Sequence, residues 1–173
     1  MHTQTCIRFD PRQDLHLCNN QIGDIGLTAL AKAITPNKDG KSVMPLLEDL
    51  TLSDNNFGDD GMRSLSIALD KGALRLLRRL LLCNNQIGDV GLTSLAKAVA
   101  KGALPLLGKL DLAHNKIGAV GALSLSVALQ RGALPELYSL YLEYNIIGDA
   151  AQNELVHVCN NREILLDDPH DLF

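Results

Sequence analysis

An aspartate and a histidine that lie close together, Asp111 and His114, come nearest in this sequence to an acid–base couple. General acid–base catalysis by such a pair needs a nucleophile or a bound metal beside it. The sequence pattern places no Ser or Cys beside this pair, and it contains neither a phosphate-binding loop nor histidines at metal-ligand spacing. We therefore expect no catalytic, cofactor-binding or metal-binding residues, and a protein that is not an enzyme.

The four cysteines lack the C-x-x-C spacing that is typical of a zinc site. Cys18 and Cys83 occupy equivalent positions two sequence repeats apart, which in a parallel sheet separates them by about 10 Å. That exceeds the ~7 Å limit between the Cα atoms of a disulfide. Because the thiols should be reduced and the N-terminal residues do not resemble a signal peptide, we expect an intracellular, cytoplasmic protein.

Two groups of residues contain tyrosine or arginine, which are enriched in protein-binding hot spots. The groups contain Arg78, Arg79, Leu81, Tyr138, Tyr141 and Tyr144, and the last three are the only tyrosines of the chain. The tyrosines either contact a partner or shield the last strand of the fold. Leu81 is either a second anchor for a partner or an ordinary surface leucine.

These residues are positioned by a repeat of about 30 residues that runs through most of the chain. An asparagine occurs at the same position of each repeat: Asn20, Asn55, Asn85, Asn115 and Asn145. Two leucines spaced two apart precede each asparagine, and an apolar residue followed by glycine comes shortly after it. The leucine pair has the period of a strand, whereas the second half of each unit has apolar residues at helical spacing. The sequence therefore predicts five strand–loop–helix units.

The expected helices have start and stop signals. Asp24, Asp59, Asp89 and Asp149 stand where an N-cap would accept backbone N–H groups of its own helix. Lys71-Gly72, Lys101-Gly102 and Arg131-Gly132 supply a cation in the last turn and then a C-terminal glycine. The junction after Ile34 has five extra residues, and we expect an exposed loop around residues 35–40.

A single unit cannot hold itself together. It offers roughly eight large apolar side chains worth ~1.5–3 kcal/mol each, whereas ordering its ~30 residues costs about 1–2 kcal/mol per residue. The units must therefore stack on one another. Strands lie ~4.8 Å apart and helices need more room, so we expect an α/β solenoid shaped as a horseshoe arc. Its parallel β-sheet should form the concave face and its short helices the convex face, with the asparagines satisfying backbone groups of adjacent turns.

The length of 173 residues is enough for one domain, and we expect residues 1–173 to form it. The predicted repeats are 12–46, 47–76, 77–106, 107–136 and 137–160, and residues 1–11 and 161–173 are terminal caps or tails. Cys6-Ile7-Arg8-Phe9 should cover the first repeat. Ile164-Leu165-Leu166 should fold back as an irregular cap over the last one.

The pattern L-x-x-L-x-L-x-x-N-x-h-G-x-x-G-h-x-x-L-x-x-A, found from Leu77 to Ala98 and from Leu107 to Ala128, resembles the ribonuclease-inhibitor class of leucine-rich repeats. The resemblance spans roughly residues 12–159, although the fifth unit has Ala151 in place of the second glycine. Arrays of this class serve as inhibitors, sensor regions of immune receptors, the GTPase-activating protein of the Ran cycle and structural subunits. The resemblance thus implies the fold and a range of functions.

Side chains between the leucines of each strand should point out of the concave sheet. The predicted partner-binding residues there are Arg78, Arg79, Leu81, Lys109, Asp111, His114, Tyr138, Tyr141, Glu143 and Tyr144. The net charge of −4 argues against nucleic acid as a partner, and the lack of a long apolar run argues against membrane insertion.

We therefore expect a non-catalytic protein–protein interaction scaffold, or a subunit of a larger assembly, that binds protein partners through its concave face. Two alternatives remain open. The resemblance suggests a GTPase regulator of the Ran-activating type. The irregular ends instead suggest a structural spacer that contacts its neighbours, or further copies of itself, end to end.

Overall fold

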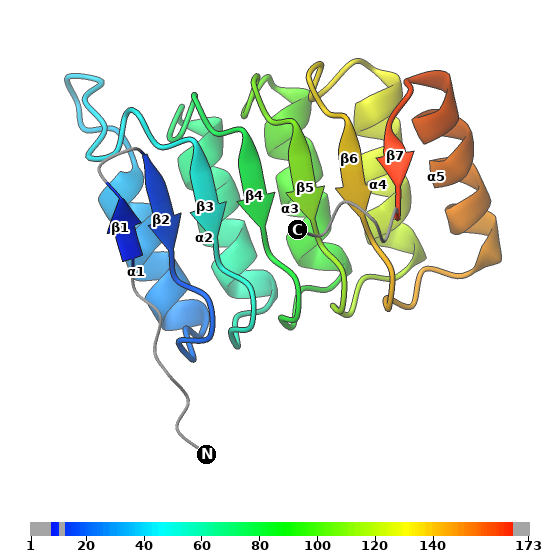
Figure 1. Ribbon diagram of the computed structural model, residues 1–173, viewed down its shortest axis with the longest axis horizontal. Coiled ribbons are helices and arrows are strands. Elements are labelled where there is room, and N and C mark those ends of the chain that lie inside the picture. The colour runs from blue at the N-terminus through cyan, green and yellow to red at the C-terminus, as the bar shows by residue number, and fades with distance from the viewer. Residues whose placement is uncertain (1–7, 11–12, 168–173) are drawn as a thin grey trace.

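The computed structural model describes residues 8–10 and 13–167, which form an alternating series of strands and helices (Figure 1). The elements are β1 (Arg8–Asp10), β2 (Asp14–His16), α1 (Asp24–Ile34), β3 (Asp49–Thr51), α2 (Asp59–Asp70), β4 (Arg79–Leu81), α3 (Asp89–Ala100), β5 (Lys109–Asp111), α4 (Ala119–Gln130), β6 (Ser139–Tyr141), α5 (Asp149–Asn161) and β7 (Leu165–Leu166). The strands form one sheet in chain order. Strands β2 to β7 are parallel, and β1 pairs antiparallel with β2.

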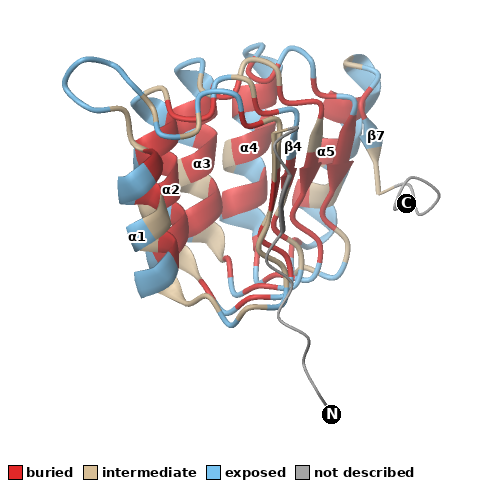
Figure 2. Ribbon diagram, turned by 60° about the vertical axis from the view of Figure 1, so that its left-hand side comes forward, coloured by how far each residue is buried: buried red, intermediate tan, exposed pale blue. Residues whose placement is uncertain are grey.

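The sheet lies on one side of the molecule and the five described helices cover its other face (Figures 1 and 2). The leucines at the centre of the strands align across the sheet, as Leu50 does with Leu80 and Leu80 with Leu110. These leucines and the inward faces of the helices form one continuous buried core. The open α/β solenoid predicted from the repeat is therefore confirmed.

The asparagines that recur at the same position of each repeat form what we call the asparagine column. As predicted, they hydrogen-bond to backbone groups of the preceding turn of the solenoid. Asn115 is buried, and its Nδ2 donates at 3.0 Å to the backbone oxygens of Leu82, Leu112 and Ala113. Its Oδ1 accepts the N–H of Ile87 at 3.0 Å. One buried amide thus satisfies four backbone groups in two consecutive repeats.

The aspartates at the helix starts do not cap their own helices, so that prediction is wrong. Asp59 is the first residue of α2, and the N-cap residue Gly58 has no side chain with which to cap this helix. The Oδ1 atom of Asp59 instead accepts the N–H groups of Gly88 and Gly91, both at 2.8 Å, at the start of α3. Because this side chain points to the neighbouring repeat, its negative charge complements the dipole of the next helix.

The same contact joins the other early repeats. The carboxylate of Asp24 accepts the N–H groups of Gly58 and Gly61, and that of Asp89 those of Gly118 and Gly121, all within 2.7–2.8 Å. We call each of these an aspartate–glycine joint. No described helix follows α5, and its first residue, Asp149, is exposed.

The joints explain the second glycine of the repeat. A Cβ atom added at Gly91 would lie 2.7 Å from Asp59 Oδ1, so a side chain there would push the carboxylate away. The fourth repeat has Ala119 in place of the aspartate, and the following repeat has Ala151 in place of the glycine. Without a carboxylate to admit, alanine fits at the start of α5 and is buried there.

The helix ends and the inserted loop agree with the sequence. Gly72, Gly102 and Gly132 have φ angles of +87° to +91° and follow the C-caps of α2, α3 and α4. Residues 37–40 are exposed. Asn37 Oδ1 holds the turn of this loop by accepting the N–H groups of Asp39 and Lys41.

The two ends of the solenoid differ from the predicted caps in part. Arg8 and Phe9 belong to β1, which covers the edge of β2, whereas Cys6 and Ile7 lie outside the described residues. At the other end the expected irregular cap is wrong. Leu165 and Leu166 form the parallel strand β7, because they continue the strand position of the repeat beside β6.

Candidate interaction surface

The predicted binding residues lie on the open side of the sheet, in three places. We call this side the sheet face: the outward side chains of β2 to β6 and the residues that flank these strands. The strand-start pocket contains Arg78, Arg79 and Tyr138, and the strand-end pair is His114 and Tyr144. The central strip consists of Leu81, Lys109, Asp111, Tyr141 and Glu143. Sequence spacing placed all ten residues on one surface, but the structure does not bring them together as one site.

The strand-start pocket is a cavity of ≈ 370 Å³. It is lined by Asp49, Arg78, Arg79, Leu106, Gly108, Glu136 and Tyr138. Arg79 forms a two-pronged ion pair with Asp49, in which Nη2 lies 2.7 Å from Oδ2 and Nε contacts Oδ1. Arg78 is held more loosely, with its Nε 3.3 Å from Glu48 Oε2. The guanidinium of Arg78 is therefore the one that a partner can reorient at lower cost.

The ionised state of the pocket follows from these contacts. Burial of the Asp49 carboxyl raises its pKa, but the hydrogen bonds from Arg79 and Asp14 outweigh this and bring it below the ordinary value. The hydrogen bond to Asp49 raises the pKa of Asp14 in turn. The hydrogen bond to Asp49 also raises the pKa of Arg79. The pocket therefore contains a charged Asp49–Arg79 pair beside a second guanidinium.

Gly108 makes room for the aromatic wall of the pocket, and the sequence analysis missed it. A Cβ atom at Gly108 would lie 2.5 Å from Tyr138 Cε1, so the tyrosine ring rests on bare backbone. Tyr138 remains 52% exposed in this position. The available signal was in the sequence: at the same position of three consecutive repeats stand Arg78, Gly108 and Tyr138, so a glycine separates two large side chains. Leu106 and Glu136 were missed because they precede the strands.

The central strip is much less accessible than expected. Tyr141 is 0% exposed and Asp111 is buried, so the expectation that these two side chains face a partner is wrong. The ring of Tyr141 lies 4.9 Å from Lys109 Nζ, and its hydroxyl lies 3.3 Å from Ser139 Oγ. The large ring is thus packed against its neighbours on the sheet. Leu81 is only half-buried, between Thr51 and Asp111 in the register of the sheet.

No hydrogen bond or ion pair is found between Asp111 and His114 in the described part of the chain, although the charge of His114 acts on the Asp111 carboxyl. Burial raises the pKa of Asp111, although its Oδ1 accepts the N–H of Ala113 at 3.0 Å. The ring of His114 stacks instead on Tyr144, with the centroids 4.1 Å apart and the planes 13° from parallel. Tyr144 is 73% exposed, so this strand-end pair presents an aromatic surface to solvent.

Glu143 lies at the edge of the central strip against the last strand. Asp167 Oδ1 accepts the N–H groups of Leu142 at 2.6 Å and of Glu143 at 3.1 Å, which places two carboxyl groups side by side. Burial, followed by the hydrogen bond with Asp167, raises the pKa of Glu143 to about 7. At neutral pH a large fraction of Glu143 is therefore protonated.

This pair predicts a pH-dependent stability at the end of the solenoid. The pKa of Glu143 is raised from 4.5 in the unfolded chain to about 7, so the folded protein binds more protons between these values. The stabilisation is present below pH 4.5 and is lost as the pH rises through 7. Because the site is partly open to solvent, Glu143→Gln should raise the free energy of unfolding at pH 8 by only about 1 kcal/mol.

Denaturant melts of the wild type and of Glu143→Gln at several pH values measure this effect. The difference between the two proteins should grow from pH 5 to pH 8. The exposed Glu136 is the matched control, because Glu136→Gln removes the same charge away from Asp167. A constant difference across this pH range would contradict the raised pKa of Glu143.

The thiols of Cys83 and Cys159 are poor nucleophiles in this fold. Burial raises the pKa of Cys83 and of Cys159 to about 11 in each case, so both remain protonated at neutral pH. Strand β3 lies between Cys18 and Cys83, and neither belongs to a disulfide. In the part of the chain that the structure describes, no cluster of three or more His, Cys, Asp or Glu side chains is arranged to hold a metal ion. Nor is any described helix long and apolar enough to cross a membrane.

Comparisons with known proteins agree with this architecture. The sequence profile of the family described as "Leucine Rich repeat" matches residues 13–31, 43–66, 73–96 and 104–126, which together exceed half of the chain. A comparison with curated protein sequences found no significant match. Among solved structures, one described as "Leiomodin-1 Actin-Binding Site 2 (ABS2)" is similar, with a TM-score of 0.65 and 14% identity over 87% of this chain and 80% of that one. At this identity the likeness concerns the fold alone. On the evidence of its own repeats and of the profile match, the chain belongs to the leucine-rich repeat family.

Proposed function

We propose that this protein is a non-catalytic interaction module that binds a protein partner through its sheet face, with the strand-start pocket as the main contact. The observation that carries this proposal is the half-exposed Tyr138, which lies over Gly108 in the pocket that Arg78 also lines. Tyrosine and arginine contribute most to binding when they surround a pocket on a rigid surface. Here the pocket is held by consecutive strands of one sheet.

The chemistry of the pocket suits an acidic or amide-bearing side chain of the partner. Such a group can bind Arg78 in place of Glu48, which holds that guanidinium at 3.3 Å only. The apolar part of the same side chain would pack on the ring of Tyr138. The strand-end pair of His114 and Tyr144 offers a second contact on the same face, so a partner that lies along the sheet can engage both.

The first named protein to test is actin, because the similar solved structure is described as an actin-binding site. Further candidate partners are captured with a photo-crosslinker placed at position 136. Actin and each captured protein then go through the same binding assay. Each candidate partner is then purified, and its affinity for the full chain is measured by titration.

Tyr138→Ala and Arg78→Ala should each weaken the affinity for the true partner about tenfold, which corresponds to about 1.4 kcal/mol. Arg63→Ala is the matched control, because Arg63 is an exposed arginine on helix α2, away from the sheet face. Melting temperatures confirm that the variants remain folded. Wild-type affinity in both sheet-face variants would reject the proposed surface.

A further inference from the structure

The helix side of the molecule carries an apolar groove that the sheet face does not explain. It lies between α3 and α4 and has a volume of ≈ 500 Å³. Its α4 wall consists of Val120, Leu123 and Val127, which are 64%, 42% and 44% exposed. Their spacing of three and four residues places them on one face of the helix. Small side chains of α3, among them Ala96 and Ala100, form the opposite wall.

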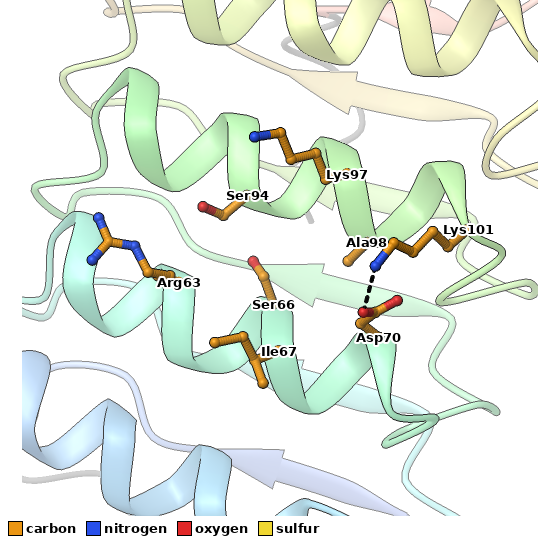
Figure 3. Close-up of a pocket in the computed structure, with 8 residues that line it drawn as sticks. All are labelled: Arg63, Ser66, Ile67, Asp70, Ser94, Lys97, Ala98 and Lys101. Atoms are coloured by element: carbon orange, nitrogen blue, oxygen red, sulfur yellow. Dashed lines mark hydrogen bonds and ion pairs between the residues drawn. The ribbon is translucent and has the colours of Figure 1, made fainter.

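The neighbouring groove, between α2 and α3, shows what is different. It has a volume of ≈ 190 Å³, and Lys101 Nζ crosses it to Asp70 Oδ2 at 2.7 Å (Figure 3). One repeat later the cation is Arg131, but Ala100 stands where α2 has Asp70. The ion pair that spans the first groove therefore has no counterpart in the second, which is crossed only nearer its start, by the hydrogen bond of 3.1 Å between Thr93 Oγ1 and Ser124 Oγ.

The charge at this groove is entirely positive. Lys97 and Arg131 line it, and no described acidic residue does. Neither cation forms a salt bridge with any residue in the described part of the chain. In a protein whose net charge is −4, an apolar furrow bordered by two unmatched cations selects a partner with apolar and negative groups side by side.

We propose that the groove between α3 and α4 binds an amphipathic helix of a partner protein that carries acidic residues beside its apolar stripe. Its longer wall runs from Val120 to Arg131, which gives the furrow a length of about 17 Å, or three turns of a third helix. The apolar stripe packs against Leu123 and Val127, and the acidic residues face Lys97 and Arg131. A narrow furrow with two cations fits a helix better than an anionic bilayer, which requires a broader basic surface.

The test uses the full chain and a fluorescein-labelled model peptide of about three helical turns. The peptide carries leucines at helical spacing with glutamates on both sides of them, and its twin carries lysine in place of each glutamate. Fluorescence anisotropy should show that the acidic peptide binds about tenfold more tightly than the twin. Val127→Asp and Arg131→Glu should each weaken binding of the acidic peptide about tenfold.

The control variant is Ile67→Asp, which makes the same change at the equivalent exposed position of α2 and should leave binding unchanged. Arg131→Glu alters an exposed side chain, so it tests the groove even if Val127→Asp does not fold. Tyr138→Ala should also bind normally, which separates this groove from the sheet face.

Three results would overturn the proposal. The first is the absence of binding, or equal binding of the acidic peptide and its lysine twin. The second is equal binding of the acidic peptide to the wild type and to both groove variants. The third is a different occupant that depends on Val127, detected either as a dimer in analytical ultracentrifugation or as adsorption to phosphatidylserine vesicles.

Discussion

Replacing Asp59 with alanine is expected to lower the free energy of unfolding by roughly 3 kcal/mol. The substitution removes one carboxylate oxygen that accepts two N–H groups at 2.8 Å, from Gly88 and Gly91. Both donors lie at the start of α3 in a partly buried joint, where water replaces the carboxylate poorly. The next helix therefore loses its cap although its own sequence is unchanged. Urea melts of the two proteins at pH 7 measure the loss.

A double-mutant cycle separates this joint from a general effect of the charge. Gly91→Ala alone places a Cβ atom 2.7 Å from Asp59 Oδ1 and should destabilise the protein despite the better helix propensity of alanine. In the Asp59→Ala background that clash is absent, as it is naturally where Ala119 precedes Ala151. The cost of Gly91→Ala should then fall by about 1 kcal/mol or more. Asp149→Ala removes an equivalent aspartate that is exposed and is followed by no helix among the described residues, so it should be nearly neutral. Additive costs in the cycle would contradict the joint.

The fold was predictable because each repeat makes the same contacts as the others. The leucines of β3, β4 and β5 recur in the sequence and coincide in the sheet, so one pattern read several times sufficed. In contrast, the sequence did not predict which helix each aspartate caps, its own or that of the next repeat. The sequence pattern of aspartates and glycines would be the same whether Asp59 caps α2 or α3. Only the paired departures at Ala119 and Ala151 in consecutive repeats indicate that the contact crosses to the next unit.

The candidate site was predictable as a face but not as a set of accessible side chains. Strand alternation placed Tyr141 on the outer side of the sheet, yet its ring is buried there and contacts Lys109 and Ser139. A local sequence pattern does not predict how side chains of neighbouring strands pack around such a ring. The pocket beside Tyr138 depends likewise on the absence of a side chain at Gly108. On the other side of the molecule, α4 has no charged residue that would mark its exposed face in the sequence.

Replacing Asn115 with alanine is expected to have a still larger effect, with a loss of roughly 4 kcal/mol in the free energy of unfolding. The amide of Asn115 donates to three backbone oxygens and accepts one backbone N–H, and these groups belong to two consecutive repeats. Its removal leaves them in a buried place without this partner and also leaves a cavity. Because the affected groups join two turns, the loss should separate the repeats on either side and lower the cooperativity of unfolding. Denaturant melts followed by circular dichroism measure both the midpoint and the slope.

Two further variants distinguish the hydrogen bonds from the cavity. Asn115→Asp keeps the shape of the side chain but turns acceptors toward three carbonyl oxygens, so at pH 7 it should be at least as destabilising as alanine. Its stability should partly recover at low pH, where the protonated carboxyl donates one hydrogen bond again. Asn115→Leu fills the space and should not restore stability, whereas Lys116→Ala at the exposed neighbouring position should be nearly neutral. If the leucine variant were as stable as the wild type, the asparagine column would act by filling space, because the backbone groups of adjacent turns would then need no amide between them.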